Sequence, residues 1–99
     1  MHNGKLDFGS YIRQLRIEHQ YSLKKVSDKL NIDISLLSKI EHGERQVQGH
    51  MLKPLAELFE LDFKNLQIQF LNQRIEADYG DEPYFLESIQ NFISNKKSK

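Results

Sequence analysis

The segment 22–45, SLKKVSDKLNIDISLLSKIEHGER, constrains the fold more than any other part of the chain. Ser22 and Asp33 are residue types that cap the first turn of a helix, and each precedes a short run with apolar residues at helical spacing. Asn31 and Gly43, residue types that tolerate a left-handed backbone, follow those runs. The pattern therefore predicts two short helices joined by a turn of about four residues.

The second of these helices has one apolar face and one largely polar face. Leu37 and Ile40 lie three residues apart and face inward. The opposite face carries Ile34, Ser35, Ser38 and Lys39. Two short helices that cross steeply around a tight turn form a helix-turn-helix motif, whose second helix fits the major groove of B-form DNA. The sequence therefore predicts that this outward face contacts DNA.

Helical spacing of apolar residues continues over the rest of the chain. The expected helices are 8–19, 22–30, 33–43, 50–61, 62–80 and 82–95. Pro54 fits the fourth helix only if that helix begins near residue 53 or if the preceding turn is loose, and Pro83 fits the first turn of the last helix. No segment shows the alternating pattern of a strand. The prediction is therefore an all-α fold.

The expected helix 62–80 begins at a capping residue, Asp62, and has two apolar sides, the first consisting of Phe63, Leu66 and Phe70. The second stripe, displaced by roughly half a turn, consists of Ile68, Leu71, Ile75 and Tyr79. The last helix adds Phe85, Ile89, Phe92 and Ile93. We expect the last helix to cover part of the second stripe and a twofold-related copy to cover the rest. The alternative is that the last helix buries the whole stripe within one chain.

Length and composition restrict the class of protein. The chain has 99 residues, of which 38% are hydrophobic and 28% charged, which is enough for one core and one folded domain. It has no cysteine, and no run reaches the ~18 apolar residues that a membrane span needs. The first twenty residues carry several charges and no signal-peptide core, so a cytoplasmic protein is expected.

Charge and histidine content bear on the ligands. The net charge is zero, but residues 1–50 carry eight Lys and Arg against six Asp and Glu, whereas residues 51–99 carry six against eight. This weak polarity permits a basic surface on the first half. The four histidines lack metal-ligand spacing, and the chain has neither a phosphate-binding glycine loop nor a recognisable nucleophile with its base. We therefore expect no metal, no cofactor, no small-molecule ligand and no enzymatic activity.

The segment 22–45 resembles, without gaps, the DNA-binding domain of the Cro/cI-type repressors, the XRE family, and the resemblance extends over roughly residues 8–70. It implies a five-helix lambda-repressor-like helix-turn-helix domain in residues 1–70 with an extended fifth helix. Residues 71–99 then form an additional helical extension, a dimerisation region. Members of the family usually pair an arginine late in the first helix with a glutamate at the end of the recognition helix. Arg16 and Glu41 occupy those positions here.

The family resemblance also implies which residues contact DNA. The implied base contacts are Asp33, Ile34, Ser35, Ser38 and Lys39. The implied contacts to the phosphate backbone are Ser22, Leu23, Lys24, His42, Arg45 and Gln46. Leu23 and Ile34 stand where many relatives have glutamine, so an apolar contact replaces a polar bridge and Ile34 is free to touch a thymine methyl group. The polar residues have an alternative role as ordinary solvated side chains.

Two functional hypotheses follow. The first is a sequence-specific transcriptional regulator, a repressor that binds double-stranded DNA at a palindromic operator as a homodimer, as phage-type repressors and restriction-modification controllers do. Its dimer interface combines the second stripe of helix 62–80 with the apolar residues of the last helix. The alternative is an antitoxin-type interaction protein whose C-terminal helices bind a partner protein.

Overall fold

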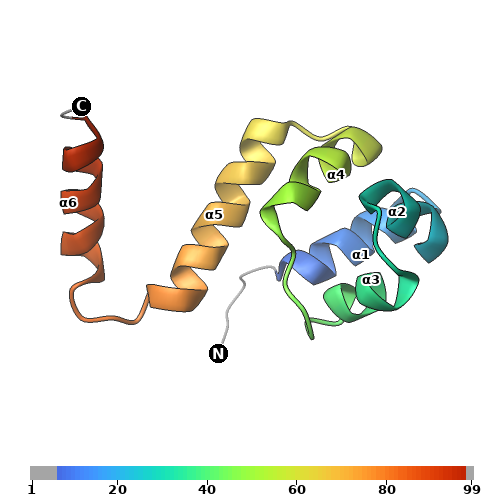
Figure 1. The fold of residues 1–99 in the computed structure, drawn as a ribbon, viewed down its shortest axis with the longest axis horizontal. Helices are drawn as coiled ribbons and strands as arrows, with labels where there is room; N and C mark the ends of the chain where they lie inside the picture. Colours follow the sequence, from blue (N-terminus) through green and yellow to red (C-terminus); the bar gives the residue numbers. More distant parts are fainter. Residues whose placement is uncertain (1–6, 98–99) are drawn as a thin grey trace.

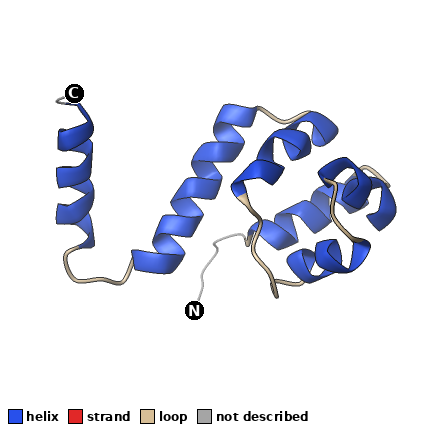
Figure 2. Cartoon of the chain, in the orientation of Figure 1, coloured by secondary structure: helices blue, strands red, loops and turns tan. Residues whose placement is uncertain are grey.

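The computed structural model describes residues 7–97, and the regular elements in this range are all helices (Figures 1 and 2). In chain order they are α1 (Phe8–Glu18), α2 (Leu23–Leu30), α3 (Ile34–Glu41), α4 (Leu52–Phe59), α5 (Phe63–Tyr79) and α6 (Phe85–Lys97). A 3-10 helix, Gly49–Met51, directly precedes α4. The predicted all-α architecture is confirmed, including the long fifth helix and the additional sixth helix.

Each of the first four helices is followed by a residue with a left-handed backbone. These residues are Gln20, Asn31, Gly43 and Glu60, with φ angles of 59°, 60°, 80° and 56°. At the end of α3 the amide of Gly43 donates to the carbonyl of Ile40 at 3.1 Å, and the amide of Glu44 donates to the carbonyl of Lys39 at 2.8 Å. This pair of bonds is a Schellman motif, which satisfies carbonyl groups that the helix end leaves open. The roles predicted for Asn31 and Gly43 are confirmed.

The core lies where the first four helices meet the first half of α5. Helix α3 packs against α1 and α2, and α4 packs against α2 and α5. The buried apolar residues are Phe8, Ile12, Val26, Leu30, Leu37, Ile40, Val47, Met51, Leu52, Leu55, Ala56, Phe59, Leu66 and Phe70. Leu37 and Ile40, the two residues predicted to face inward from α3, are 0% and 1% exposed. Their burial holds α3 against the core by its apolar face and leaves its other face in solvent.

Two of the predicted helix starts differ in detail from the structure. Asp33 and Asp62 both occupy N-cap positions, but neither side chain makes a capping hydrogen bond. Both residues are exposed, where water satisfies a carboxylate as well as a helix amide does. Pro54 is the third residue of α4, within the first turn, where its missing N–H breaks no helical hydrogen bond.

The expectation for Pro83 is wrong. Helix α6 begins at Phe85, so Pro83 lies in the connection before it rather than in its first turn. The amide of Glu82 donates to the carbonyl of Tyr79, and the amide of Phe85 donates to the carbonyl of Glu82, so the chain makes two successive turns before α6 can start. Phe63 is 40% exposed and does not share the burial of the other two residues in its stripe.

The second half of α5 and all of α6 extend away from the core, and the two helices form an open V (Figure 1). The second stripe of α5 remains in solvent: Ile68, Leu71, Ile75 and Tyr79 are 47%, 47%, 37% and 60% exposed. Helix α6 reaches only one part of this stripe, where Phe85 and Ile89 line a groove together with Ile75. The alternative that α6 buries the whole stripe within one chain is therefore wrong.

Candidate nucleic-acid interface

The outward face of α3 is a continuous surface at one end of the domain. Of the five residues that the family resemblance assigns to base contacts, Asp33, Ile34, Ser35 and Lys39 are exposed. Ile34 exposes 44% of its surface, so its apolar side chain is accessible to a partner. Ser38 is half-buried because it lies at the edge of this face, beside the core. A partner that docks on α3 therefore meets four freely accessible side chains and one at the margin.

The residues assigned to phosphate contacts surround this face. Ser22, Lys24, His42, Arg45 and Gln46 are exposed, whereas the side chain of Leu23 packs against the core. An anion can therefore reach Leu23 only at its main-chain amide, which lies at the N-terminal end of α2. Such helix ends present amide groups with a partial positive charge.

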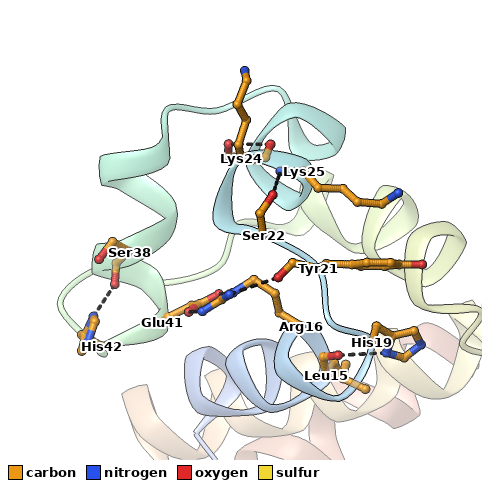
Figure 3. A network of polar contacts seen from close by, with 11 residues as sticks. Leu15, Arg16, His19, Tyr21, Ser22, Lys24, Lys25, Ser38, Glu41 and His42 are labelled. Atoms are coloured by element: carbon orange, nitrogen blue, oxygen red, sulfur yellow. Dashed lines mark hydrogen bonds and ion pairs between the residues drawn. The ribbon is translucent and has the colours of Figure 1, made fainter.

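Local hydrogen bonds order the side chains at both ends of the motif (Figure 3). The hydroxyl of Ser22 accepts a bond from the amide of Lys25 at 3.0 Å, which is the predicted N-cap. Nδ1 of His42 lies 2.8 Å from the carbonyl oxygen of Ser38. Lys24 Nζ lies 3.2 Å from a carboxylate oxygen of Asp28, but both side chains are largely exposed. Exposed pairs of this kind are weak, so the lysine can exchange its carboxylate for a phosphate.

Arg16 and Glu41 are in direct contact through two parallel hydrogen bonds (Figure 3). Arg16 Nε donates to Glu41 Oε2 at 2.8 Å, and its Nη2 donates to Oε1 at 3.0 Å. A third bond, from Nη1 to the carbonyl oxygen of Tyr21 at 3.2 Å, reaches the connection between α1 and α2. The hydrogen bonds to Glu41 raise the pKa of the Arg16 guanidinium above its ordinary value. One side chain thus joins α1, the end of α3 and the segment that leads into α2.

Gly9 is a second anchor of α3, which was not predicted from the sequence. It is buried in α1, and a Cβ atom at this position would overlap the main-chain carbonyl oxygen of Ile40 in α3. Only glycine allows the two helices to approach this closely. A glycine near the start of a helical pattern was the available signal, but a glycine there is also compatible with a merely weakened helix.

The first three helices, the left-handed turn at Asn31 and the exposed face of α3 together have the arrangement of a helix-turn-helix (Figure 1). A comparison with protein families matches residues 9–70, more than half of the chain, to the helix-turn-helix domain. The chain belongs to this helix-turn-helix family. Searches among curated proteins and among solved structures find no match. Membership in the family indicates a DNA-binding regulator.

Aromatic side chains hold the connection that leads into the helix-turn-helix. The ring of Tyr21 stacks on Phe59 of α4 at a centroid distance of 5.9 Å, and His19 packs against both rings, 5.3 Å from Tyr21 and 5.1 Å from Phe59. Lys25 Nζ lies 4.5 Å from the centre of the Tyr21 ring, a cation–π contact. These contacts position the Ser22 end of α2, and they were not predicted from the sequence.

Two further properties of this helix-turn-helix protein concern other classes of ligand. Within residues 7–97, no group of three or more His, Asp or Glu side chains is arranged to hold a metal ion. In the same part of the chain, no helix combines the length and the apolar character that crossing a membrane requires.

Proposed function

We propose that this protein is a sequence-specific transcriptional regulator of the Cro/cI type, a repressor that binds a palindromic operator in double-stranded DNA as a homodimer. The observation that carries the proposal is the accessible face of α3 on a helix that the Arg16–Glu41 pair anchors at its far end. By occupying its operator, such a protein blocks access of the polymerase. The roles that the family resemblance implies are those of a phage-type repressor or a restriction-modification controller.

The side chains of α3 match the chemistry of base edges in the major groove. Lys39 is long enough to donate to O6 or N7 of guanine, and Ser35 can donate or accept a hydrogen bond. Ile34 suits the methyl group of thymine because it is apolar and 44% exposed. Asp33, an acceptor without a donor, selects against bases that present only acceptors at its position. Ser38, half-buried at the edge, contributes at the margin of the site.

Phosphate contacts on either side of α3 orient it in the groove. On one side are Ser22, Lys24 and the main-chain amide of Leu23 at the start of α2. On the other side are His42, Arg45 and Gln46, which are exposed at and beyond the Schellman turn of α3. Contacts of this type supply affinity and register without sequence preference.

The homodimer is supported by the exposed apolar residues of the last two helices. A single module of this size contacts few bases, and two copies on half-sites one helical turn apart give useful specificity. The proposed interface consists of Ile68, Leu71, Ile75, Tyr79, Phe85, Ile89, Phe92 and Ile93. The stripe on α5 is at least 37% exposed throughout, and α6 has no buried residue. A surface this apolar is typical of an interface.

The DNA-reading assignment predicts different effects for Lys39→Ala and Arg45→Ala. In fluorescence anisotropy with a duplex selected from a random pool, Lys39→Ala should weaken binding by about 1–3 kcal/mol and relax the preference at one base pair. Arg45→Ala should weaken all duplexes similarly and lower the salt dependence by about one counterion. Lys64→Ala, on α5, is the control and should change neither. Equal losses on every duplex for both variants would contradict the base-contact role of Lys39.

The dimer assignment predicts that Leu71→Asp combined with Ile75→Asp separates the two copies. Four charges would then enter one apolar interface, so the dissociation constant should rise at least a hundredfold, about 2.7 kcal/mol. Sedimentation equilibrium measures the change, and far-UV circular dichroism should show that the monomer stays helical. Asn65→Asp combined with Gln67→Asp is the matched control on α5. If the Leu71/Ile75 variant still sediments as a dimer, the interface lies elsewhere. If the unmodified protein is monomeric until a partner protein is added, the antitoxin-type alternative is favoured.

A further inference from the structure

Helix α6 lacks sufficient packing partners within its own chain. It has 13 residues, and none of them is buried. Leu86, Phe92 and Ile93 expose 72%, 58% and 46% of their surfaces. A helix shorter than about 15 residues is marginal in water without tertiary packing. Its own chain therefore leaves most of the apolar surface of α6 uncovered.

The chain does provide one half of such a contact. A groove runs between the second half of α5 and the first half of α6, and Ile75, Glu76, Phe85, Leu86 and Ile89 are among the residues that line it. Figure 1 shows that the C-terminal end of α6 stands apart from α5. Each chain thus has an apolar groove near the connection of α5 and α6 and two apolar side chains, Phe92 and Ile93, beyond it.

Residues 68–97, which include the second half of α5 and all of α6, form an arm. Its charges are divided between its two ends. The segment 76–87 contains five acidic residues and no Lys or Arg. The opposite end of α6 carries Lys96 and Lys97. Helical spacing places Lys96 on the same face as Ile89 and Phe92, and its Nζ lies 5.7 Å from the centre of the Phe92 ring. The groove end of the arm is therefore acidic, and the free end is basic.

We infer that two copies interlock through these arms, with α6 of each copy lying antiparallel in the groove of the other. Phe92 and Ile93 of one copy enter the groove of the second copy beside its Ile75, and Lys96 of the first copy lies beside Glu76 of the second. A twofold axis makes both contacts twice, so the acidic and basic ends of two identical chains complement each other. The inference deepens the proposed homodimer by naming which segment fills which groove.

The exposed area agrees with this occupant. Ile68, Leu71, Ile75, Tyr79, Tyr84, Leu86, Phe92 and Ile93 are the large apolar residues exposed on the arm. From their exposed fractions they present roughly 800–1,000 Å² per chain, and a stable interface of standard size buries about 800 Å² on each partner. Because α5 runs without a break from buried Leu66 and Phe70 to Ile75, the interlocked arms also determine how far apart the two α3 helices lie.

The test uses the absence of cysteine in the chain, which makes introduced thiols the only ones. A variant with Glu76→Cys and Lys96→Cys is treated with a short bismaleimide at micromolar concentration without DNA. Within one chain the two sites are separated along α6, since Lys96 lies about 10 Å of helix rise beyond Ile89, which lines the groove together with Glu76. Across the interface they are adjacent, and proximity raises the effective thiol concentration from micromolar to about millimolar. The expected result is at least about tenfold more covalent dimer than either single-cysteine variant or Glu18→Cys with Lys96→Cys forms.

Three results would overturn the inference. A covalently closed monomer would show that α6 folds onto its own α5. Sedimentation as a dimer without a cross-linked product would place the interface on another surface. Sedimentation of the untreated protein as a monomer would show that the occupant of the groove is not a second copy. Because no DNA is present, failure of α3 to bind an operator leaves the cross-linking result unchanged, so the DNA-binding part of the proposed function and this inference fail separately. A monomer would overturn the homodimer of the proposed function as well.

Discussion

Replacing Arg16 with alanine is expected to lower the free energy of unfolding by about 3–5 kcal/mol. The side chain of Glu41 is only 2% exposed, and Arg16 donates the hydrogen bonds of 2.8 and 3.0 Å that satisfy its carboxylate. The substitution leaves that charge buried without a partner, which is far more costly than the loss of an exposed ion pair. Urea denaturation followed by far-UV circular dichroism measures the difference.

Two further substitutions separate the pairing from other effects of removing an arginine. Arg13→Ala removes an exposed arginine from the same helix and should change the stability by less than about 0.5 kcal/mol. Arg16→Lys keeps the charge but loses the planar fork, so its effect should lie between the other two. If Arg16→Ala cost no more than Arg13→Ala, the buried ion pair would not be the anchor of α3.

The contribution of this pair should be constant over the neutral pH range. The hydrogen bonds to Glu41 raise the pKa of Arg16 above its ordinary value. A cation with a raised folded-state pKa stabilises the fold at every pH below its unfolded value and loses this contribution only as the pH rises through the folded value. Both values for an arginine are far above neutrality. Its role in α3 placement is therefore independent of physiological pH.

Gly9→Ala is expected to destabilise the protein by about 2–3 kcal/mol, although alanine is normally favoured over glycine in a helix by about 1 kcal/mol. The added Cβ would overlap the carbonyl oxygen of Ile40, a main-chain atom that cannot rotate away. Helix α1 must then move relative to α3, which also disturbs the Arg16–Glu41 pair. Thermal unfolding measures the loss as the difference in the free energy of unfolding between the variant and the unmodified protein, evaluated at one temperature.

Gly49→Ala is the matched control for this prediction. A Cβ at Gly49 meets no atom within 4 Å, so the substitution should be neutral or stabilise slightly by restricting the unfolded chain. Gly9→Ala with a stability equal to that of Gly49→Ala would show that α1 can withdraw from α3 at no cost. The close approach of the two helices would then not contribute to the placement of the DNA-reading face.

Some of the helix ends could be predicted from the sequence and others could not. Asn31 and Gly43 predict left-handed turns because these residue types adopt that conformation with little strain. Gln20 and Glu60 adopt the same conformation, with φ angles of 59° and 56°, but their residue types give no such signal. There, the packing of the helices on either side stabilises a turn that local preference alone would not choose.

The candidate site also combines features that the sequence predicts with features that it does not. Helical spacing alone separates the buried residues of α3 from its outward face, and four of the five proposed base-contact residues are exposed. The proximity of Arg16 and Glu41, 25 residues apart, was an implication of the family resemblance rather than of any local pattern. The close approach at Gly9 and the ring cluster around Tyr21 depend on neighbours distant in sequence, so no local pattern reveals them.

The sequence by itself determined the helices, their order and which face of α3 is polar, because capping residues and apolar spacing act within a few residues of the chain. It also showed that α5 has two apolar sides. Only the tertiary structure decided that one side is buried through Leu66 and Phe70 while the other stays in solvent beside an α6 without buried residues. Apolar spacing predicts that a helix face packs against another surface. Which surface it packs against depends on the geometry of the connections, such as the two turns that place the start of α6 at Phe85.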